Sequence, residues 1–291
     1  MYKRSWRKRR DFFLIIKMKK IKVAIQGTQA SFHEEAAFKY FGNDIETLEC
    51  ESFKSTCDAL KQKQVDYVVM AIENSIAGSL LPNYNLLQEY RFPIVGEVYL
   101  NIQLHLMALP GSKIEDIKFV ESHPIALRQC FDFLEEHPEI KASEGMDTAA
   151  CAKRIAQEKI KGTAAIANQL AAKMYGLEIL DRRIETNKKN YTRFLILTRQ
   201  TRENPKANKA SLSFQTGNQP GALVGILNHF AQRNINMSKI QSMPVLGKRN
   251  EYIFHIDVEW EKAEDYESAI GKVIKHTINF NILGEYTKCR I

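Results

Sequence analysis

The sequence predicts an α/β protein of two lobes followed by a smaller β-α-β-β-α-β unit. Three observations support this prediction. Apolar runs of strand length, such as 65–72, alternate with amphipathic helical segments as far as residue 198, which is typical of mostly parallel sheets. Residues 199–209 are polar, contain one proline and indicate a linker. The final segment then follows the order of a split β-α-β arrangement.

The first elements are a strand at 22–26 and a helix that begins at Ser31. Ser31 and Glu34 have the spacing of a capping box, in which each side chain satisfies a free backbone N–H at the helix start. The apolar run 65–72 has the length of a buried strand, and the polar stretch 73–79 follows it at once. This part of the chain therefore predicts repeated strand–helix units.

The middle of the chain repeats the alternation. A strand-rich stretch covers 95–109, and a helix begins at Pro124, because proline suits the first helical position. Asp147 and Thr148 begin an alanine-rich helix, and a strand of small residues follows at 163–167. These elements predict the second lobe.

The C-terminal unit has four predicted strands and two helices. Strands are expected at 210–216, 236–242 and 278–283, and apolar residues alternate along a further strand at 252–258. One helix begins at Pro220, and a second precedes the last strand. This order predicts a small independent domain.

The basic charge of the chain is confined to its first 20 residues. The 291-residue sequence has a net charge of +8, but residues 1–20 hold nine of its 42 Lys and Arg residues and one of its 34 Asp and Glu residues. The remaining 33 of each sign balance, so the body offers no electrostatic surface for nucleic acid. The apolar run 12–16 is too short for a signal peptide core or a membrane span. A basic targeting or RNA-binding arm is one interpretation of this leader, and we favour an upstream start codon with Met18 as the initiator.

Cysteine and histidine patterns predict a protein without disulfides or metal. The five cysteines are odd in number and form no C-x-x-C pair, which favours reduced thiols and a cytoplasmic location. The seven histidines show no paired ligand spacing, so neither a metal nor another cofactor is expected. No segment has the length of a membrane span, so no membrane partner is expected.

Polar residues gather where loops and helix starts converge in open α/β sheets, which is where such folds bind ligands. Free N–H groups at helix starts suit anions, so hydroxyls there, with one arginine, would hold a small carboxylate-bearing molecule. Each residue also has a simpler explanation, as an N-cap or as a member of a structural ion pair. The candidates are Ser31, Ser75, Ser79, Thr148 and Arg193, with Phe32 and Phe194 as walls for a ring.

Four ordered motifs resemble those of prephenate dehydratases. They are AIENSIAGSL at 71–80, SHPIALRQC at 122–130, AAIANQLAAKMYGLEIL at 164–180 and NYTRFLIL at 190–197. The C-terminal unit resembles the ACT domain attached to that family, and the whole likeness covers about residues 21–288. It implies a lyase that converts prephenate to phenylpyruvate, water and carbon dioxide on the route to phenylalanine.

The resemblance also implies a domain organisation. A catalytic domain at 21–199 would have two lobes around a cleft, similar to type II periplasmic binding proteins. A linker at 200–208 would precede a ferredoxin-like ACT regulatory domain at 209–291. Members associate through ACT domains, so a homodimer or homotetramer is expected. The lobes are expected at about 21–97 with 185–199, and at about 98–184.

The family's site residues map onto this chain by motif. Thr192 matches the essential threonine and is expected to hydrogen-bond the departing oxygen. Arg193 would grip a carboxylate. Glu73 or a water could relay a proton, because a buried Glu can stay protonated near neutrality. The expected substrate-binding residues are Ser31, Phe32, Asn74, Ser75, Ser79, Thr148 and Phe194.

The turn that leads into the helix at Ser31 and Phe32 departs from the family pattern. The usual Gly-Pro-Glu-Gly-Thr-Phe reads Gly27-Thr28-Gln29-Ala30-Ser31-Phe32 here, so one proline and one glycine are lost. Ser31 keeps the hydroxyl, and we therefore expect a shifted loop with retained function.

The ACT-like segment implies regulation by L-phenylalanine. The segment PGALVGIL at 220–227 matches the motif that binds phenylalanine at a domain interface. The partner motif, Glu-Ser-Arg-Pro in the family, has lost a carboxylate and a guanidinium here, yet inhibition is still expected. The expected effector residues are Gly221, Ala222, Leu223, Val224, Gln241, Ser242, Met243 and Pro244.

Two other functions stay open on the sequence. Arogenate dehydratase differs only by an amino group in place of the keto oxygen of the substrate, and no residue decides between the two. A non-catalytic sensor of a small carboxylate or amino acid would use the same cleft, but it has no need of a proton-donor hydroxyl such as Thr192.

Overall fold

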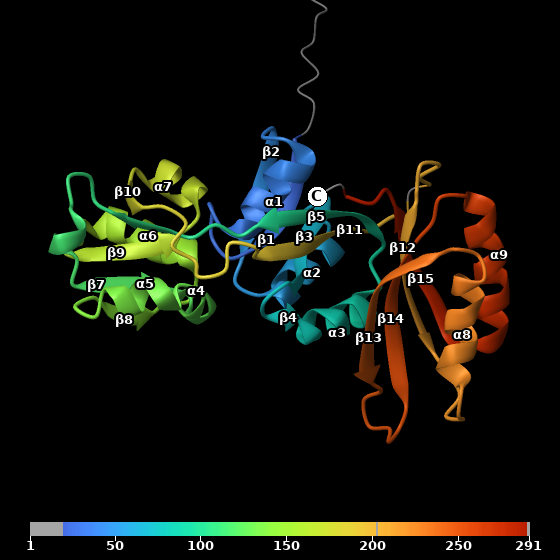
Figure 1. The fold of residues 1–291 in the computed structure, drawn as a ribbon. Helices are drawn as coiled ribbons and strands as arrows, with labels where there is room; N and C mark the ends of the chain where they lie inside the picture. Colours follow the sequence, from blue (N-terminus) through green and yellow to red (C-terminus); the bar gives the residue numbers. More distant parts are fainter. Residues whose placement is uncertain (1–19, 202, 290–291) are drawn as a thin grey trace, which may run out of the picture.

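The computed structural model describes residues 20–201 and 203–289, which form two α/β lobes and a C-terminal domain in a row (Figure 1). Except for Lys20, the basic leader lies outside the described residues. No helix in the described ranges is long and apolar enough to cross a membrane. Within the same ranges no group of His, Cys, Asp and Glu side chains is arranged to hold a metal ion.

The first lobe is built on a six-stranded sheet in the order β2-β1-β3-β11-β5, with β4 paired to β3. β1 runs parallel to β2 and β3, whereas β11 lies antiparallel between β3 and β5. The chain therefore returns to the first lobe after building the second. β5 ends at Asn101 rather than at residue 97, the expected edge of the lobe. The elements are β1 (Ile21–Gln26), α1 (Phe32–Phe41), β2 (Ile45–Cys50), α2 (Phe53–Lys61), β3 (Tyr67–Asn74), β4 (Gly78–Ser79), α3 (Leu81–Tyr90), β5 (Ile94–Asn101) and β11 (Tyr191–Thr198).

The start of α1 differs in detail from the predicted capping box. Ser31 Oγ accepts a hydrogen bond from Glu34 N–H, as a capping box requires. The Glu34 carboxylate, however, accepts from Ala30 N–H at 2.5 Å and from the Thr47 hydroxyl at 2.6 Å. Glu34 thus ties the helix start to the preceding turn and to β2.

The second lobe has a five-stranded sheet in the order β10-β6-β9-β7-β8. β7 is parallel to β8 and β9, and β6 is antiparallel to β9 and β10. His123 and Asp147 cap the helices α4 and α6, and both residues line a cavity together with residues of the first lobe. The elements are β6 (His105–Ala108), η1 (Ile114–Asp116), β7 (Phe119–Ser122), α4 (Pro124–Gln129), α5 (Phe131–Glu136), β8 (Lys141–Glu144), α6 (Thr148–Glu158), β9 (Thr163–Ala167), α7 (Gln169–Tyr175) and β10 (Glu178–Asp181).

The C-terminal domain has the predicted β-α-β-β-α-β order. Its four strands form an antiparallel sheet in the order β13-β14-β12-β15. Figure 1 shows α8 and α9 on the face of this sheet that points away from the lobes. The elements are β12 (Lys209–Gln215), α8 (Ala222–Ala231), β13 (Asn236–Pro244), β14 (Tyr252–Glu259), α9 (Ala263–Val273), η2 (Ile274–His276) and β15 (Ile278–Tyr286).

Side-chain alternation gives this sheet two different faces. Leu212 and Phe214 of β12 pack into the core beneath α8 and α9. Ser211, which precedes Leu212, faces the other way and lines a small hollow together with residues of the first lobe. Tyr286 and Met243 complete an apolar cluster of the first lobe. The domain is therefore packed against the lobe through a face of its own sheet.

A glycine permits the closest approach between the two sheets. Gly284 of β15 lies against Ile94 of β5, and a Cβ at residue 284 would collide with the Ile94 carbonyl. The two strands run side by side at this point (Figure 1). The small residue therefore sets how closely the C-terminal sheet can pack.

His255 is buried in the same interface, with 3% of its surface exposed. Its Nε2 lies 2.9 Å from Gln88 Nε2 on α3, and its ring lies 5.0 Å from that of Tyr84. Burial lowers the pKa of His255 to about 4, although the nearby Asp257 carboxylate opposes this shift. His255 is therefore neutral in the folded protein near neutral pH.

This burial makes stability depend on pH. The unfolded imidazole takes up a proton near pH 6.5, whereas the folded one does so only near pH 4, so the stability from neutral His255 is complete above pH 6.5 and is lost as the pH falls toward 4. We expect this residue to lower the free energy of unfolding by about 2 kcal/mol between pH 7.5 and pH 5. Urea unfolding of wild type and His255→Gln at both pH values measures it. An unchanged pH dependence in the variant would contradict this assignment.

Candidate active site

A cavity of about 470 Å³ lies between the two lobes. It is bounded by the starts of α1, α4 and α6, by the end of β3 and by the start of β11. A larger hollow of about 880 Å³ lies between the first lobe and β15, but its walls contain none of the residues predicted for the site. The smaller cavity is therefore the candidate active site. Its lining residues include Ser31, Phe32, His33, Phe53, Asn74, Ser79, His123, Gln129, Asp147, Thr148, Thr192 and Phe194.

The Thr192 hydroxyl is held in this cavity by an amide. Asn74 Nδ2 donates to Thr192 Oγ1 at 2.9 Å, and Asn74 Oδ1 in turn accepts from the backbone N–H groups of Ile76 and Ala77. A hydroxyl has one proton to donate, and here its oxygen already receives a hydrogen bond. The Thr192 proton is consequently available to a molecule in the cavity.

The amide network continues beyond the predicted residues. Asn190 is fully buried, and its Oδ1 accepts from Asn74 Nδ2 at 2.7 Å. Its own Nδ2 donates to Gln129 Oε1 at 3.0 Å, on the second lobe. Sequence reasoning did not single out Asn190 and Gln129 individually, although both lie within the motifs NYTRFLIL and SHPIALRQC. The network links the end of β3, the start of β11 and α4.

The turn before α1 keeps an unusual backbone conformation. Ala30 has a φ of 64°, in the left-handed region that glycine adopts more easily. The family pattern has glycine at this position, so the change from glycine to alanine places strain on the backbone of Ala30. Ser31 and Phe32 nevertheless still line the cavity. The hydrogen bond that Ala30 N–H donates to the Glu34 carboxylate helps to hold the turn.

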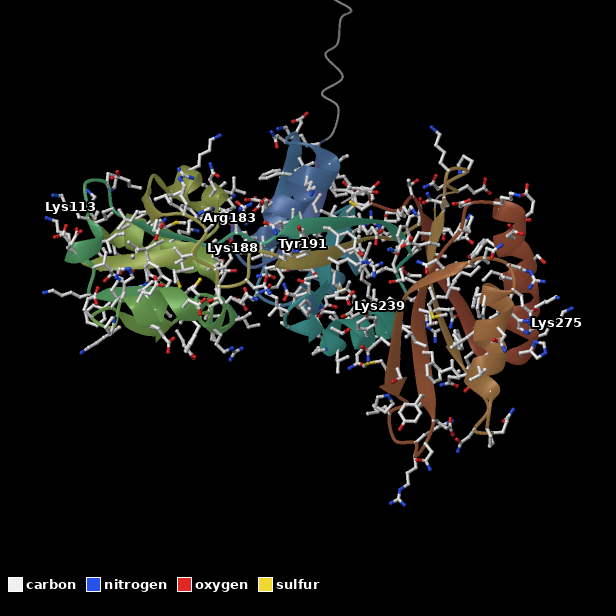
Figure 2. All side chains as sticks on the ribbon, in the orientation of Figure 1. Lys113, Arg183, Lys188, Tyr191, Lys239 and Lys275 are labelled. Atoms are coloured by element: carbon white, nitrogen blue, oxygen red, sulfur yellow. The ribbon has the colours of Figure 1, made fainter. Side chains whose placement is uncertain are left out.

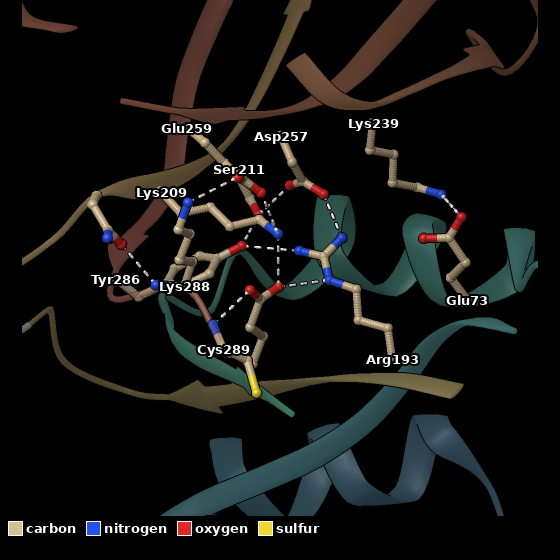
Figure 3. A network of polar contacts seen from close by, with 12 residues as sticks. Glu73, Arg193, Lys209, Ser211, Lys239, Asp257, Glu259, Tyr286, Lys288 and Cys289 are labelled. Atoms are coloured by element: carbon tan, nitrogen blue, oxygen red, sulfur yellow. Dashed lines mark hydrogen bonds and ion pairs between the residues drawn. The ribbon is translucent and has the colours of Figure 1, made fainter. Parts of the chain in front are cut away.

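Arg193 does not line the cavity, which corrects the predicted carboxylate grip. Alternate residues of a strand face opposite sides, so Arg193 points away from Thr192 and toward the C-terminal domain. Only 3% of its surface is exposed. Its Nε donates to Glu97 at 2.8 Å, its Nη1 pairs with Asp257, and its Nη2 donates to the Tyr286 hydroxyl at 3.0 Å (Figure 3).

The surrounding groups satisfy one another. Ser211 donates to the second oxygen of Asp257 at 2.5 Å, and Lys209 pairs with Glu97 at 3.1 Å and Glu259 at 3.2 Å (Figure 3). Burial alone would raise the pKa of Asp257, but the Arg193 guanidinium beside it holds that pKa below its ordinary value. The network is therefore a set of charged, buried ion pairs that joins the C-terminal domain to the first lobe.

Glu73 is likewise absent from the cavity wall, so the predicted proton relay has no geometric support. Its Oε1 pairs with Lys239 Nζ of β13 at 2.9 Å. Lys239 also donates to Ser79 Oγ at 3.1 Å, and Ser79 does line the cavity. Figure 2 shows Lys239 between the C-terminal sheet and the first lobe. Lys239 of the C-terminal domain thus contacts Ser79, a residue of the cavity wall.

Ser75 also turns away from the cavity. Its Oγ donates to the Lys189 carbonyl at 3.3 Å and accepts from Tyr191 N–H at 2.9 Å. Ser75 therefore fastens the segment that leads into β11. The predicted residues that do line the cavity are Ser31, Phe32, Asn74, Ser79, Thr148, Thr192 and Phe194.

Contacts between the lobes close one edge of the cavity. Asp147 caps α6 through Ala150 N–H at 2.9 Å and accepts from the Thr28 hydroxyl at 3.4 Å across the lobes. A Cβ at Gly27 would collide with Asp147, so the glycine allows this approach. Burial raises the pKa of Asp147, although hydrogen bonds from the start of α6 act against it. Only the capping role of Asp147 was evident in the sequence.

The predicted effector residues fall into two groups in one chain. A hollow of about 220 Å³ at the start of α8 is lined by Gly221, Ala222, Leu223 and Val224. The segment 241–244 belongs to β13 and does not line this hollow, and the side chain of Met243 packs in the first-lobe cluster instead.

Comparisons with known proteins identify a family model and several relatives that match this chain. The family model described as PDT, prephenate dehydratase, matches residues 23–202. Arogenate dehydratase 2 of Petunia hybrida is 37% identical over 284 residues, which cover 92% of this chain and 72% of the relative. The bifunctional chorismate mutase/prephenate dehydratase of Aquifex aeolicus is 34% identical over 272 residues, which cover 93% and 74% of the two chains.

A solved structure shares the whole architecture. The prephenate dehydratase of Arthrobacter aurescens, in complex with L-Phe, superposes with a TM-score of 0.82 at 28% identity. The match covers 92% of this chain and 90% of that one. The similarity therefore includes the C-terminal domain as well as the two lobes.

The Arg193 network predicts a large effect on stability. Arg193→Met leaves Glu97 and Asp257 buried without their cation, and we expect it to lower the free energy of unfolding by roughly 3–5 kcal/mol. Arg154→Met removes two pairs at the surface, with Glu121 and Glu158, and should cost about 1 kcal/mol. Urea unfolding of the two variants beside wild type measures the difference. Equal losses would mean that the buried network does not hold the domains.

Proposed function

The chain belongs to the prephenate dehydratase family, and we propose that it converts prephenate to phenylpyruvate, water and carbon dioxide. The observation that carries this proposal is the Thr192 hydroxyl, which lines the cavity and whose oxygen receives a hydrogen bond from Asn74. The Phe32 side chain is partly exposed in the same cavity and suits contact with a six-membered ring, whereas Phe194 is 1% exposed and packs in the core behind the cavity wall.

The reaction needs a proton for its leaving group. Prephenate loses its ring carboxylate as carbon dioxide and its ring hydroxyl as hydroxide, and the electron pair of the broken C–C bond completes the aromatic ring. One proton converts the departing hydroxide to water. Thr192 would hydrogen-bond this oxygen as negative charge develops on it, and the bond from Asn74 to Thr192 Oγ1 makes the threonine a stronger donor. The proton that converts the departing hydroxide to water comes from solvent.

The carboxylates would be held by neutral donors. The lining residues in the described chain include hydroxyls, amides, imidazoles and the Asp147 carboxylate that caps α6, but no lysine or arginine. The starts of α1 and α6 add free backbone N–H groups beside Ser31 and Thr148. His123 Nδ1 accepts from Ile125 N–H, so its neutral ring carries the proton on Nε2 and can donate it. Burial lowers the pKa of His123, which favours this neutral form.

Arogenate is the alternative substrate, and the name of the Petunia relative supports it as directly as the name of the Aquifex relative supports prephenate. Arogenate carries an amino group where prephenate carries a keto oxygen, and the leaving hydroxyl and ring carboxylate are the same. The role proposed for Thr192 therefore holds for either substrate. The choice between them depends on the part of the cavity that holds the side chain.

The test is an ultraviolet assay of prephenate turnover beside an assay of phenylalanine formation from arogenate. We expect wild type to convert prephenate, and we expect Thr192→Val to lower kcat by roughly 10²–10³ because it removes a hydrogen bond made chiefly in the transition state. Thr192→Ser keeps the hydroxyl and should keep most of the rate.

A matched control lies at the other end of the same strand. Thr198 donates to the Asp66 carbonyl at 3.2 Å and does not line the cavity. Thr198→Val should therefore leave kcat unchanged. Normal turnover by Thr192→Val would refute the proposed role of Thr192, and no turnover of either substrate by wild type would refute the proposed function.

We also propose that the C-terminal domain is an ACT domain that binds L-phenylalanine and joins chains into a homodimer or homotetramer. The Arthrobacter relative was solved with L-Phe, and the hollow at the start of α8 contains the predicted motif. The segment 241–244 lies outside that hollow in one chain, so a site made from both motifs would need a second chain.

L-Phenylalanine should bind with saturable heat and lower the rate of turnover. Val224→Asp places a carboxylate in the hollow and should abolish the heat by repelling the effector's carboxylate. Ile274→Asp is the control, because Ile274 is exposed and lies outside the hollow. Isothermal titration of the three proteins measures this. Absence of heat with wild type would mean that the domain serves assembly alone.

A further inference from the structure

A β-bulge directs Lys239 toward the first lobe. Met237 of β13 lies opposite Val258 of β14 and packs in the core of the C-terminal domain. Lys239 lies opposite Asp257, the residue next to Val258, so β13 holds one extra residue at this point. In a regular ladder Lys239 would share the core face with Met237, because side chains alternate along a strand. The bulge instead places it on the face of Asp257, which meets the first lobe.

Lys239 contacts both strands of one hairpin of the first lobe. Glu73 of β3 lies directly opposite Ser79 of β4. Lys239 Nζ pairs with Glu73 Oε1 at 2.9 Å (Figure 3), and it donates to Ser79 Oγ at 3.1 Å. It also lies 5.7 Å from the centre of the Tyr84 ring, and only 9% of the lysine side chain is exposed. The ammonium therefore bridges the two strands from a nearly buried position.

The turn of this hairpin supports the Thr192 hydroxyl. Asn74 and Gly78 form the next pair of the hairpin, and the turn between them supplies the N–H groups of Ile76 and Ala77. Both groups donate to Asn74 Oδ1, at 3.0 and 2.8 Å. With its oxygen held in this way, the Asn74 amide presents its nitrogen to Thr192 Oγ1 at 2.9 Å. The position of the turn thus decides where the amide lies.

We propose that Lys239 is a positioning residue for the reaction. By bridging Glu73 and Ser79 it fixes the hairpin turn, and the turn fixes the Asn74 amide and the Thr192 hydroxyl. This inference rests on the proposed function. A group misplaced by about 1 Å can lower a rate by up to 10²-fold. Since the hydrogen bond from Thr192 is made chiefly in the transition state, the loss falls on kcat rather than on KM.

Two variants of Lys239 test the bridge. Lys239→Met keeps an unbranched apolar side chain and removes the ammonium. We expect it to lower kcat about tenfold and to change KM less than twofold, because the Thr192 hydroxyl is less well placed. Lys239→Arg keeps a cation with several donors and should recover most of the rate. An unchanged kcat in Lys239→Met, or no recovery in Lys239→Arg, would overturn the inference.

A double variant separates this role from general support of the fold. If Lys239 acts through Thr192, Lys239→Met should lower kcat less than twofold once Thr192→Val has already removed the hydroxyl. Steady-state kinetics of the two single variants, the double variant and wild type measure this. The same tenfold fall in both backgrounds would show that the two residues act independently, and the inference would then be wrong.

Lys248→Met is the matched control. Lys248 follows β13 in the same domain and pairs with Glu251 at 3.0 Å, but its side chain is 58% exposed and lies outside the cavity wall. We expect Lys248→Met to leave kcat unchanged. A tenfold fall in this variant would assign the loss to the charge of the domain rather than to the bridge, and would overturn the inference.

The inference and the proposed function fail in different ways. If wild type turns over neither substrate, the proposed function fails, and hydrogen exchange then tests the bridge directly. The backbone amides of Ile76 and Ala77 should exchange faster in Lys239→Met than in wild type and Lys248→Met, because their bonds to Asn74 open more often. Equal exchange would overturn the role of Lys239. If wild type is active and Lys239→Met has a normal kcat, only the role of Lys239 fails.

Discussion

The buried ion pairs of Arg193 are the interaction on which the arrangement of the three units depends. A strand directs successive side chains to opposite sides, so β11 presents Thr192 and Phe194 to the cavity and Arg193 to the C-terminal sheet. Asp257 comes from another domain, yet it contributes to the same buried network as Glu97 of β5. Separating the domains would break the pair between Arg193 and Asp257 and expose the apolar side chains packed beside it to water. The position of the C-terminal sheet is therefore tied to the strand that carries the proposed catalytic hydroxyl.

A second contact ties the same sheet to the cavity wall. Lys239 of β13 bonds Ser79, which lines the cavity, and pairs with Glu73 on the far face of β3. Together with Arg193, it holds both strands whose cavity faces carry Asn74 and Thr192. Asn74 and Thr192, which hydrogen-bond each other in the cavity, are thus each next in sequence to a residue that pairs with the C-terminal domain. Any displacement of β13 or β14 alters contacts one residue away from that pair.

Much of this arrangement follows from local sequence, and the part that does not has a common physical cause. Helix caps and apolar runs placed Ser31, Thr148 and the strands correctly, because those signals act over a few residues. The orientation of Arg193 was predicted wrongly, although strand alternation already forbids it from sharing a face with Thr192. Its partner Asp257 lies 64 residues further along the chain, and no local sequence pattern predicts such a pairing. Glu73 was misjudged for the same reason, since Lys239 reaches it from another domain.

The chemical character of the cavity suits a reaction that discards a carboxylate. A lysine or arginine beside that group would stabilise the charged ground state, and the stabilisation would be lost as the charge moves into the ring and the leaving group. Interactions that are equally strong or stronger in the ground state do not accelerate a step. In the proposed function, the described lining residues would hold the anion with hydroxyls, amides, imidazoles and helix starts, and the Thr192 hydroxyl would lie where negative charge grows. The position of Arg193 in the domain interface fits the proposed function, because its guanidinium pairs there with Glu97 and Asp257, and the ring carboxylate of a bound substrate would have no cation beside it to oppose its loss.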